Sequence, residues 1–277
     1  LYDTKVYGHA SKIGYFPDTF GIYGQAPQIL KQAGIDTAAF GRGVKPTGFN
    51  NTVSDTPNFE SPFSEIVWKS PDGSSVLGIL FANWYSNGNE IPIDMEEAKV
   101  FWDKKIQDAE KYASTNQLLF MNGCDHQPLQ KTIPQAIETA GALYSDYTFK
   151  HSSFDEYIQA LKVSLPNNLQ IIEGELRNQR TDGWSTLVNT ASSRIYLKQW
   201  NTRCQILLEK VVEPLAAINL LAGGDYPREY IRFMWKTLMK NHPHDSICGC
   251  SVDEVHREMV TRFETVSQMG DVFVKEL

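Results

Sequence analysis

The hydrophobic pattern of this chain changes once, near residue 173, and that change limits the possible folds more than any other feature. Before it, short apolar runs of strand type alternate with segments of helical periodicity, which is the pattern of a mainly parallel sheet covered by helices. After it, apolar residues recur at helical spacing over a long stretch. We therefore predict an α/β domain over residues 1–173 and a helical bundle over residues 174–277.

Periodicity, turn residues and helix caps predict the individual elements. Asp94 is expected to cap one helix, and Ser152 or Ser153 another. A strong turn signal, Pro-Asp-Gly at residues 71–73, separates two of the strands. The expected strands are residues 36–40, 63–68, 76–81, 118–121 and 147–150, and the expected helices are residues 27–33, 95–114, 134–143, 154–165, 192–221, 227–240 and 252–275.

Charge and cysteine content argue against several classes of protein. The formal net charge of −7 gives no general basic surface, so we expect no nucleic-acid partner and no binding to anionic membranes. No apolar run reaches the ~18 residues typical of a membrane span. The four cysteines are too sparse for a disulfide framework, and Cys248 and Cys250 lack the second pair that a structural zinc site needs. We expect four reduced thiols and a cytoplasmic protein.

The segment NHPHDSICGC, residues 241–250, places two imidazoles and a carboxylate within four positions. It follows an expected helix, and Pro243 removes a backbone donor and favours an extended conformation before it. Imidazole nitrogen and carboxylate oxygen are metal ligands, so the segment is a candidate metal site. The alternative is helix capping and surface hydrogen bonding.

Two other segments place an Asp in a Gly/Pro-rich turn directly after an apolar run. They are GYFPDTFG at residues 14–21, which contains Asp18, and FMNGCDHQP at residues 120–128, which contains Asp125. Carboxylates at strand ends are typical of the chemistry of α/β barrels. The residues alone also allow plainer functions, a turn or helix cap for Asp18 and a loop carboxylate bonded to backbone amides for Asp125.

Together these three segments resemble the glycoside hydrolase family 38 α-mannosidases, particularly the bacterial branch. TASSR at residues 190–194, Lys198, Asn201 and EPL at residues 213–215 extend the resemblance into the family's helical middle domain, in the family's order. The resemblance implies an incomplete seven-stranded β/α barrel followed by a helical bundle. It also implies a retaining α-mannosidase that acts on terminal α-mannosyl residues of a mannoside or oligosaccharide and uses one divalent metal, Zn²⁺. The full-length enzyme is a candidate homo-oligomer.

The resemblance assigns the catalytic and metal-binding functions to three residues. Asp18 corresponds to a nucleophile that also binds the metal, and His244 corresponds to a metal ligand from the helical domain. Asp125 corresponds to the general acid/base, and burial beside Cys124 would favour its protonated form. His242 is then expected to be structural.

Substrate contacts are implied for three further side chains. Tyr85 corresponds to a tyrosine that contacts the bound sugar, and an ordinary core aromatic is the alternative. Arg42 is a candidate for binding substrate hydroxyls or an anionic group, with a surface salt bridge as the alternative. Asp245 is expected to bind sugar hydroxyls or to orient the site. His151 and His256 have no motif around them, and we expect them on the surface.

The sequence departs from the family pattern at its N-terminal end. The family supplies two more zinc ligands from a His-x-Asp motif on its first strand, and no His here is followed two residues later by Asp. We therefore expect an internal fragment that lacks two of four ligands, binds metal weakly and is inactive alone. Two rival interpretations are a metal-dependent polysaccharide deacetylase and a non-catalytic carbohydrate-binding fragment.

Overall fold

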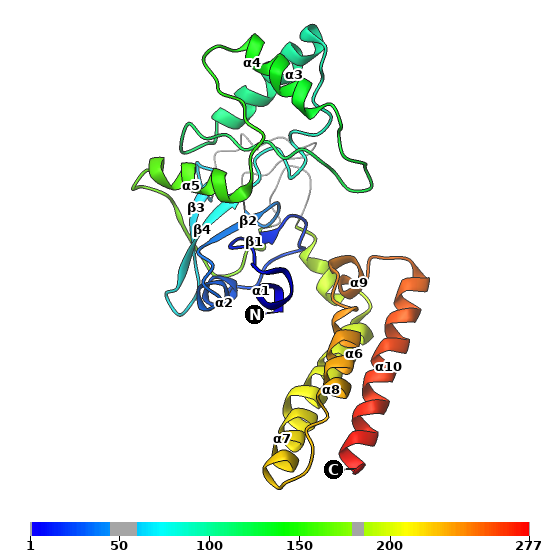
Figure 1. Ribbon diagram of the computed structural model, residues 1–277. Coiled ribbons are helices and arrows are strands. Elements are labelled where there is room, and N and C mark those ends of the chain that lie inside the picture. Colours follow the sequence, from blue (N-terminus) through cyan, green and yellow to red (C-terminus); the bar gives the residue numbers. More distant parts are fainter. Residues whose placement is uncertain (1, 45–59, 179–185, 277) are drawn as a thin grey trace. The chain divides into compact units, whose positions relative to one another are not determined.

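The computed structural model describes residues 2–44, 60–178 and 186–276 (Figure 1). Contacts divide the chain into two compact units, Leu1–Leu187 and Val188–Leu277. The first is a mixed α/β unit and the second is helical. None of the described helices is long and apolar enough to cross a membrane.

The first unit is built on a five-stranded sheet. Its order is β1 (Gly14–Phe16), β2 (Thr37–Phe40), β4 (Ser75–Leu80), β3 (Glu65–Lys69) and β5 (Ile171–Glu173). β1, β2 and β4 run parallel to one another, with Phe16 opposite Phe40 and Phe40 opposite Leu80. β3 runs antiparallel to β4, so the expected mainly parallel sheet is mixed. The reason is the predicted turn at residues 71–73, because strands joined by so short a turn must pair antiparallel.

Each face of this sheet is covered by different elements. Alternate residues of β2 and β4 point to opposite faces. Phe40 and Leu80 pack with Ile22, Ala26 and Leu176 on one face, next to helix α2 (Ala26–Gln32). The other face carries Ala39 and Ile79, which pack against Tyr157, Ile158 and Leu161 of α5 (Phe154–Ser164). The strand ends are therefore held rigidly between two apolar layers.

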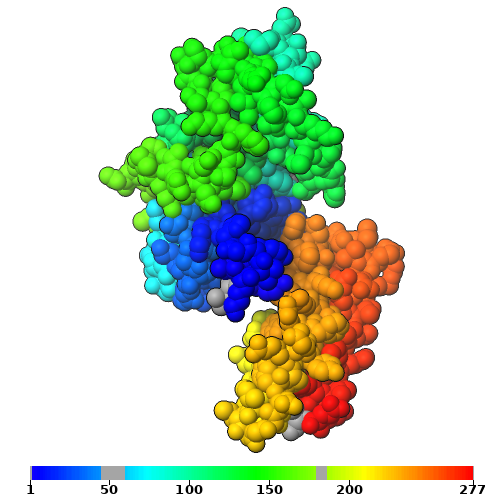
Figure 2. Space-filling model, in the orientation of Figure 1, coloured from blue at the N-terminus to red at the C-terminus, as the bar shows by residue number. Residues whose placement is uncertain are grey.

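Helix caps in the first unit form where the sequence predicts them. Asp94 accepts hydrogen bonds from the amides of Glu96 and Glu97 at the start of α3 (Met95–Glu110). Ser153 and Glu156 form a capping box at the start of α5. α3 packs with α4 (Ile133–Leu143) around the buried Trp102, and Figure 2 shows the surrounding segments as one turquoise and green lobe of this unit. The short helix α1 (Tyr2–Tyr7) was not predicted.

Two predicted strands, residues 118–121 and 147–150, are wrong: neither segment joins the sheet. In the first, the buried side chain of Asn87 takes the place of a partner strand. Its Oδ1 accepts from the amide of Met121 at 2.7 Å, and its Nδ2 donates to the carbonyl of Leu119 at 2.9 Å. In the second, Phe149 packs against Trp102 with ring centroids 4.9 Å apart. The apolar side chains of both segments pack against the rest of the unit, and neither segment pairs with a strand.

The second unit is a bundle in which α6 (Ile195–Ile206), α8 (Arg228–Met239) and α10 (Asp253–Glu276) lie side by side (Figure 1). The helix expected over residues 192–221 begins later, after the 3₁₀ turn η2 (Val188–Ser192). It then continues from α6 through a π-helical stretch, η3 (Leu207–Val212), into α7 (Glu213–Leu221). Pro214 explains the π-helical stretch, because it has no backbone N–H to donate to the preceding turn.

The core of this bundle is apolar and fully enclosed. Leu208, Met234, Leu238 and Phe263 are among its completely buried members. A further short helix, α9 (His244–Cys248), follows α8 directly and ends at Gly249 in the left-handed conformation. The sequence predicted that α8 ends just before the motif at residues 241–250. The second imidazole of that motif, His244, is the first residue of α9.

Candidate active site

Three predicted site residues follow three neighbouring parallel strands. Asp18 comes after β1, Arg42 after β2 and Tyr85 after β4. Because the carboxyl ends of parallel strands meet at one edge of a sheet, these side chains reach the same place. An ion pair joins two of them, since Nε of Arg42 donates to Oδ1 of Asp18. Tyr85 lies near them, because a Cβ built on Gly41 would be 3.3 Å from Cδ1 of Tyr85 and 2.2 Å from the carbonyl oxygen of Pro17. Burial, and after it the charge of Asp18, raises the pKa of Tyr85.

Arg42 is enclosed by the protein. Its side chain is only 4% exposed, and its guanidinium lies 5.1 Å from the ring centroid of Phe20 and 4.8 Å from that of Trp84. Cation–π contacts of this kind stabilise a desolvated arginine. In this structure Arg42 therefore fixes the orientation of the Asp18 carboxylate. Phe20 and Trp84 were not predicted as part of the site, although Phe20 lies within the motif that contains Asp18 and Trp84 directly precedes Tyr85.

Tyr85 lies near both candidate catalytic carboxylates. Its hydroxyl donates to Oδ2 of Asp125 at 3.3 Å, a long distance for this kind of bond. Burial, followed by the charges of Asp18 and Asp125, raises the pKa of Tyr85 well above its usual range. The phenol therefore stays protonated and remains a hydrogen-bond donor at neutral pH.

Asp125 is held by the segment that the Asn87 side chain fixes. Just before it, Nδ2 of Asn122 donates to the carbonyl of Gly88 at 2.8 Å. The expected burial of Asp125 beside Cys124 is wrong, because both residues are exposed. The turn that carries them extends away from the apolar layer, with His126 at a φ of 61°.

Tyr15 is a further residue of this site that the sequence analysis did not select. It lies on β1 inside the motif that contains Asp18, and it is half exposed. Burial, and after it the charge of Asp125, raises its pKa, so Tyr15 also lies near that carboxylate. Its place in the motif was the available signal. Gly14 is buried, so Tyr15, the next residue of the strand, points to the opposite face. The site thus combines two carboxylates with two phenols.

The backbone after β2 passes very close to the backbone after β1. A Cβ added to Gly41 would lie 2.2 Å from the carbonyl oxygen of Pro17, the neighbour of Asp18. Real Cβ atoms do not approach a backbone oxygen so closely. The absence of a side chain at Gly41 therefore lets the strand ends that carry Arg42 and Asp18 meet.

We expect Gly41→Ala to destabilise the first unit and to displace Asp18. Overpacking of this kind typically costs about 1–3 kcal/mol, a loss of several degrees in melting temperature. Gly141→Ala is the matched control, because Gly141 lies inside α4 with nothing within 4 Å of the added Cβ. That change should stabilise the helix by roughly 0.5–1 kcal/mol. Thermal unfolding of the two variants measures both effects, and a Gly41→Ala protein as stable as wild type would contradict the steric argument.

His244 and Asp245 begin helix α9 in the second unit. Their side chains are 43% and 60% exposed, and Nε2 of His244 lies 3.6 Å from Oδ1 of Asp245. Neighbouring His242 has a structural contact instead, because Nε2 of His242 donates to Oδ1 of Asn201 at 2.8 Å. Burial lowers the pKa of His242, which favours a neutral ring. That His244 serves one site with Asp18 stays a prediction.

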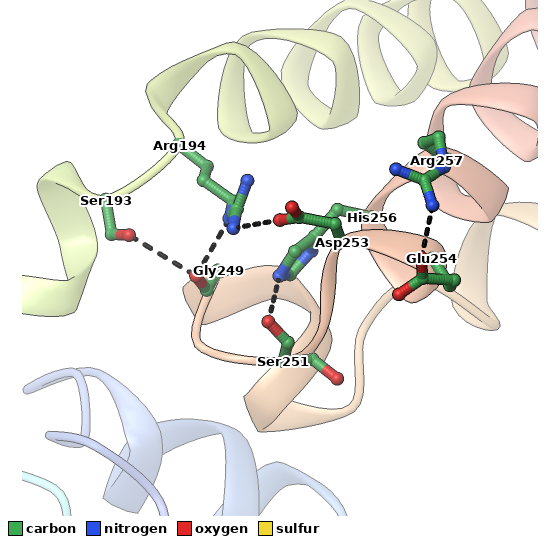
Figure 3. A network of polar contacts seen from close by, with 8 residues as sticks. All are labelled: Ser193, Arg194, Gly249, Ser251, Asp253, Glu254, His256 and Arg257. Carbon is green, nitrogen blue, oxygen red and sulfur yellow. Dashed lines mark hydrogen bonds and ion pairs between the residues drawn. The ribbon is translucent and has the colours of Figure 1, made fainter.

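The two histidines expected on the surface differ. His151 is exposed, as predicted. His256 is only 1% exposed, so the prediction for it is wrong. It lies on the inner side of α10, where its Nε2 donates to the carbonyl of Ser251 at 3.1 Å (Figure 3).

The donor types at these positions suit a zinc ion, but their number does not complete a site. A carboxylate oxygen and an imidazole nitrogen are ordinary zinc ligands, and a catalytic zinc site uses about three of them from the protein. Within residues 2–44, 60–178 and 186–276, no group of three or more His, Cys, Asp or Glu side chains is placed to hold a metal ion. The residues described here therefore do not form a closed metal site.

Two family descriptions match nearly the whole chain. "Glycosyl hydrolases family 38 N-terminal domain" matches residues 2–182, and "Alpha mannosidase middle domain" matches residues 185–277. The boundary between them falls close to the division between the two compact units.

Individual relatives agree with these descriptions. A protein of Halalkalibacterium halodurans with the provisional name mannosylglycerate hydrolase is 62% identical, over 99% of this chain and 30% of its own length. The "Alpha-mannosidase" of Saccharomyces cerevisiae is 25% identical, over 98% of this chain and 24% of its own. The crystal structure of an alpha-mannosidase from Enterococcus faecalis superposes with a TM-score of 0.90 at 53% identity, covering 99% of this chain and 30% of that one. The chain thus spans under a third of the length of these relatives.

Proposed function

Because this chain belongs to glycoside hydrolase family 38, we propose that it forms the catalytic part of a retaining α-mannosidase that hydrolyses terminal α-mannosyl residues. The observation that carries the proposal is the cluster at the carboxyl edge of the sheet. There Arg42 binds Asp18, and Tyr85 contacts Asp125 and is affected by the charge of Asp18. A retaining glycosidase needs two carboxylates with different functions on either side of the scissile bond, and this cluster supplies two in different surroundings.

The two surroundings suit the two chemical functions. Asp18, held by Arg42, would attack the anomeric carbon while Asp125 gives its proton to the departing glycosidic oxygen. The product of this first step is a mannosyl ester of Asp18 and a free alcohol. In the second step Asp125 takes a proton from water, the water oxygen attacks the anomeric carbon, and the ester bond to Asp18 breaks. Asp125 is the more exposed carboxylate, which suits exchange with water.

Tyr85 and Tyr15 would act on the sugar and on Asp125. A phenol can donate to a pyranose hydroxyl while its ring packs against the apolar face of the sugar. The raised pKa of both residues keeps them as donors. Asp245 is proposed as a further residue that binds sugar hydroxyls from the second unit.

We propose that the full-length fold is a seven-stranded β/α barrel followed by the helical bundle. Three parallel strands with polar side chains at their carboxyl ends are the arrangement such a barrel requires. We also propose that Asp18 and His244 are two of the ligands of one zinc ion. When bound, this ion would interact with hydroxyls of the sugar ring and stabilise charge. The missing ligands would come from residues outside those described here.

The family implies a mannoside substrate. Direct assay must identify the aglycone. The relative named for mannosylglycerate makes a small carboxylate-bearing aglycone the first candidate to test. Arg42 is enclosed by two rings and paired with Asp18, so recognition of a carboxylate would fall to other residues. The four cysteines are free, which supports the proposed cytoplasmic location.

The decisive experiment is to trap the covalent intermediate. A mannosyl fluoride with a second fluorine on the ring loses its anomeric fluoride to form an ester that hydrolyses slowly. Peptide mass spectrometry should therefore locate a fluoromannosyl group on Asp18. A deacetylase would activate water instead of forming an ester, and a non-catalytic carbohydrate-binding protein would form no adduct. An adduct on any other carboxylate would contradict the assignment of Asp18 as nucleophile.

A further inference from the structure

Helix α9 is too short to be stable without its neighbours. It spans five residues, His244–Cys248, and carries His244 and Asp245 in its first turn. Isolated helices shorter than about 12 residues are marginal in water. Its own backbone bonds are few, such as Ile247 N–H to the carbonyl of Pro243 at 3.0 Å. The positions of His244 and Asp245 therefore depend on what holds the rest of α9.

The first such contact is Lys198 of α6. Its Nζ donates to the carbonyls of Thr190 at 3.1 Å, Cys248 at 3.0 Å and Ser193. These carbonyls lie at the C-terminal ends of η2 and α9. A cation suits this position, because unpaired carbonyls give a helix C-terminus a partial negative charge. Lys198 is thus a shared cap for two short helices.

The second contact is Arg194, which directly precedes α6. Its Nε donates to the carbonyl of Gly249 at 3.2 Å and its Nη2 to Asp253 at 2.7 Å (Figure 3). Arg194 has a φ of 45°, a left-handed conformation that a residue with a side chain rarely adopts. Such strain is maintained where the surrounding contacts require it. Through these two contacts, Arg194 connects the start of α6 to the loop after α9 and to the start of α10.

Gly249 allows this close approach. Its φ is +83°, and an added Cβ would lie 3.2 Å from both the carbonyl oxygen of Ser193 and Cβ of Arg194. The hydroxyl of Ser193 also donates to the Gly249 carbonyl, at 3.4 Å. Figure 3 shows Ser193 and Arg194 both pointing to this carbonyl. The end of α9 is thus pressed against the η2–α6 junction.

We propose that Lys198 and Arg194 are positioning residues that fix α9 and thereby orient His244 and Asp245. The inference rests on the proposed function for its effect on turnover. Its structural part does not, because the contacts with α9 exist whatever the protein hydrolyses. Neither residue is proposed to touch the substrate.

The test compares Lys198→Met with Arg257→Met in the full-length protein. Methionine keeps the length of the lysine side chain and removes its charge and donors. Arg257 is the control because its ion pair with Glu254 lies on the exposed face of α10 in the same region (Figure 3). For Lys198→Met we expect the amides of residues 246–250 to exchange hydrogen at least tenfold faster, with no change in α8 and α10. We also expect kcat/KM to fall at least tenfold, and Arg257→Met to stay within twofold of wild type in both measurements.

A conservative variant separates positioning from general stability. Lys198→Arg keeps a cationic donor and should recover most of the exchange protection and activity. Faster exchange throughout the bundle, or unchanged exchange in residues 246–250, would overturn the proposal. If wild type shows no glycosidase activity, the proposed function fails, and local exchange alone decides whether Lys198 holds α9. Should Lys198→Met not fold, Arg194→Gln is measured in the same way against the same control.

Discussion

Replacing Asp18 with Ala in the full-length protein should abolish turnover. The carboxylate is proposed to form the bond to the sugar, and Arg42 holds it in place. Loss of a nucleophile commonly lowers kcat by about three or more orders of magnitude. Steady-state hydrolysis of aryl mannosides measures the effect. Retention of more than about a tenth of wild-type kcat would eliminate Asp18 as the nucleophile.

The control for this substitution must account for Arg42. Its side chain is 4% exposed, so removal of Asp18 breaks a buried ion pair, and breaking such a pair typically costs about 3–5 kcal/mol. Asp18→Asn keeps the shape and a hydrogen-bond acceptor and should be equally inactive but more stable. If Asp18→Asn unfolds as readily as Asp18→Ala, the loss of activity would say nothing about chemistry, and the trapped ester would have to carry the assignment.

The same variant tests the proposed zinc ligands. Binding of an ion to the folded state raises its stability by RT ln(1 + [L]/Kd), so zinc should raise the melting temperature of the wild type. Asp18→Ala and His244→Ala should both remove most of this increase. A His244→Ala protein with wild-type zinc content would show that His244 is not a ligand, without affecting the case for Asp18 as nucleophile.

The positions of three candidate site residues after strands follow from local patterns, whereas their functions were implied by the family resemblance and stay predictions. Asp18, Arg42 and Tyr85 each come after a strand whose apolar run ends in turn residues, and parallel pairing then brings strand ends together. The capped helices α3 and α5 were predicted for the same reason, because a cap and the helix it begins are neighbours in sequence. Patterns among residues close in sequence were therefore sufficient to predict features that depend on a single strand or helix.

The errors come from contacts between distant residues. Residues 118–121 have the composition of a strand, but the side chain of Asn87 bonds their backbone. His256 stands alone in the sequence, and its burial depends on how α10 packs. Lys198 binds backbone carbonyls. Because every residue has such a carbonyl, the residue types in the sequence do not indicate which ones Lys198 binds. Such contacts appear only once the bundle is assembled.

We expect Asp125→Ala to slow the hydrolysis of substrates with basic leaving oxygens far more than that of activated aryl mannosides. A general acid is needed only when the departing oxygen cannot leave as an anion, and general acid catalysis contributes about 10²–10⁴ in rate. A mannoside with a simple alkyl leaving group should therefore lose at least about a hundredfold in kcat/KM, whereas a dinitrophenyl mannoside should lose less than about tenfold. The comparison of the two substrates within one variant is the measurement.

The control is Tyr85→Phe, which keeps Asp125 and removes the phenol that contacts it at 3.3 Å. If Tyr85 acts through sugar binding, this variant should slow both substrates by a similar factor, because it leaves the acid in place. Azide gives a second check on Asp125→Ala. As an anion it attacks the mannosyl ester without a general base, so it should restore turnover of the aryl substrate and yield mannosyl azide. Equal losses on both substrates, together with no rescue by azide, would rule out Asp125 as the acid and base and would leave its contact with Tyr85 as a structural one.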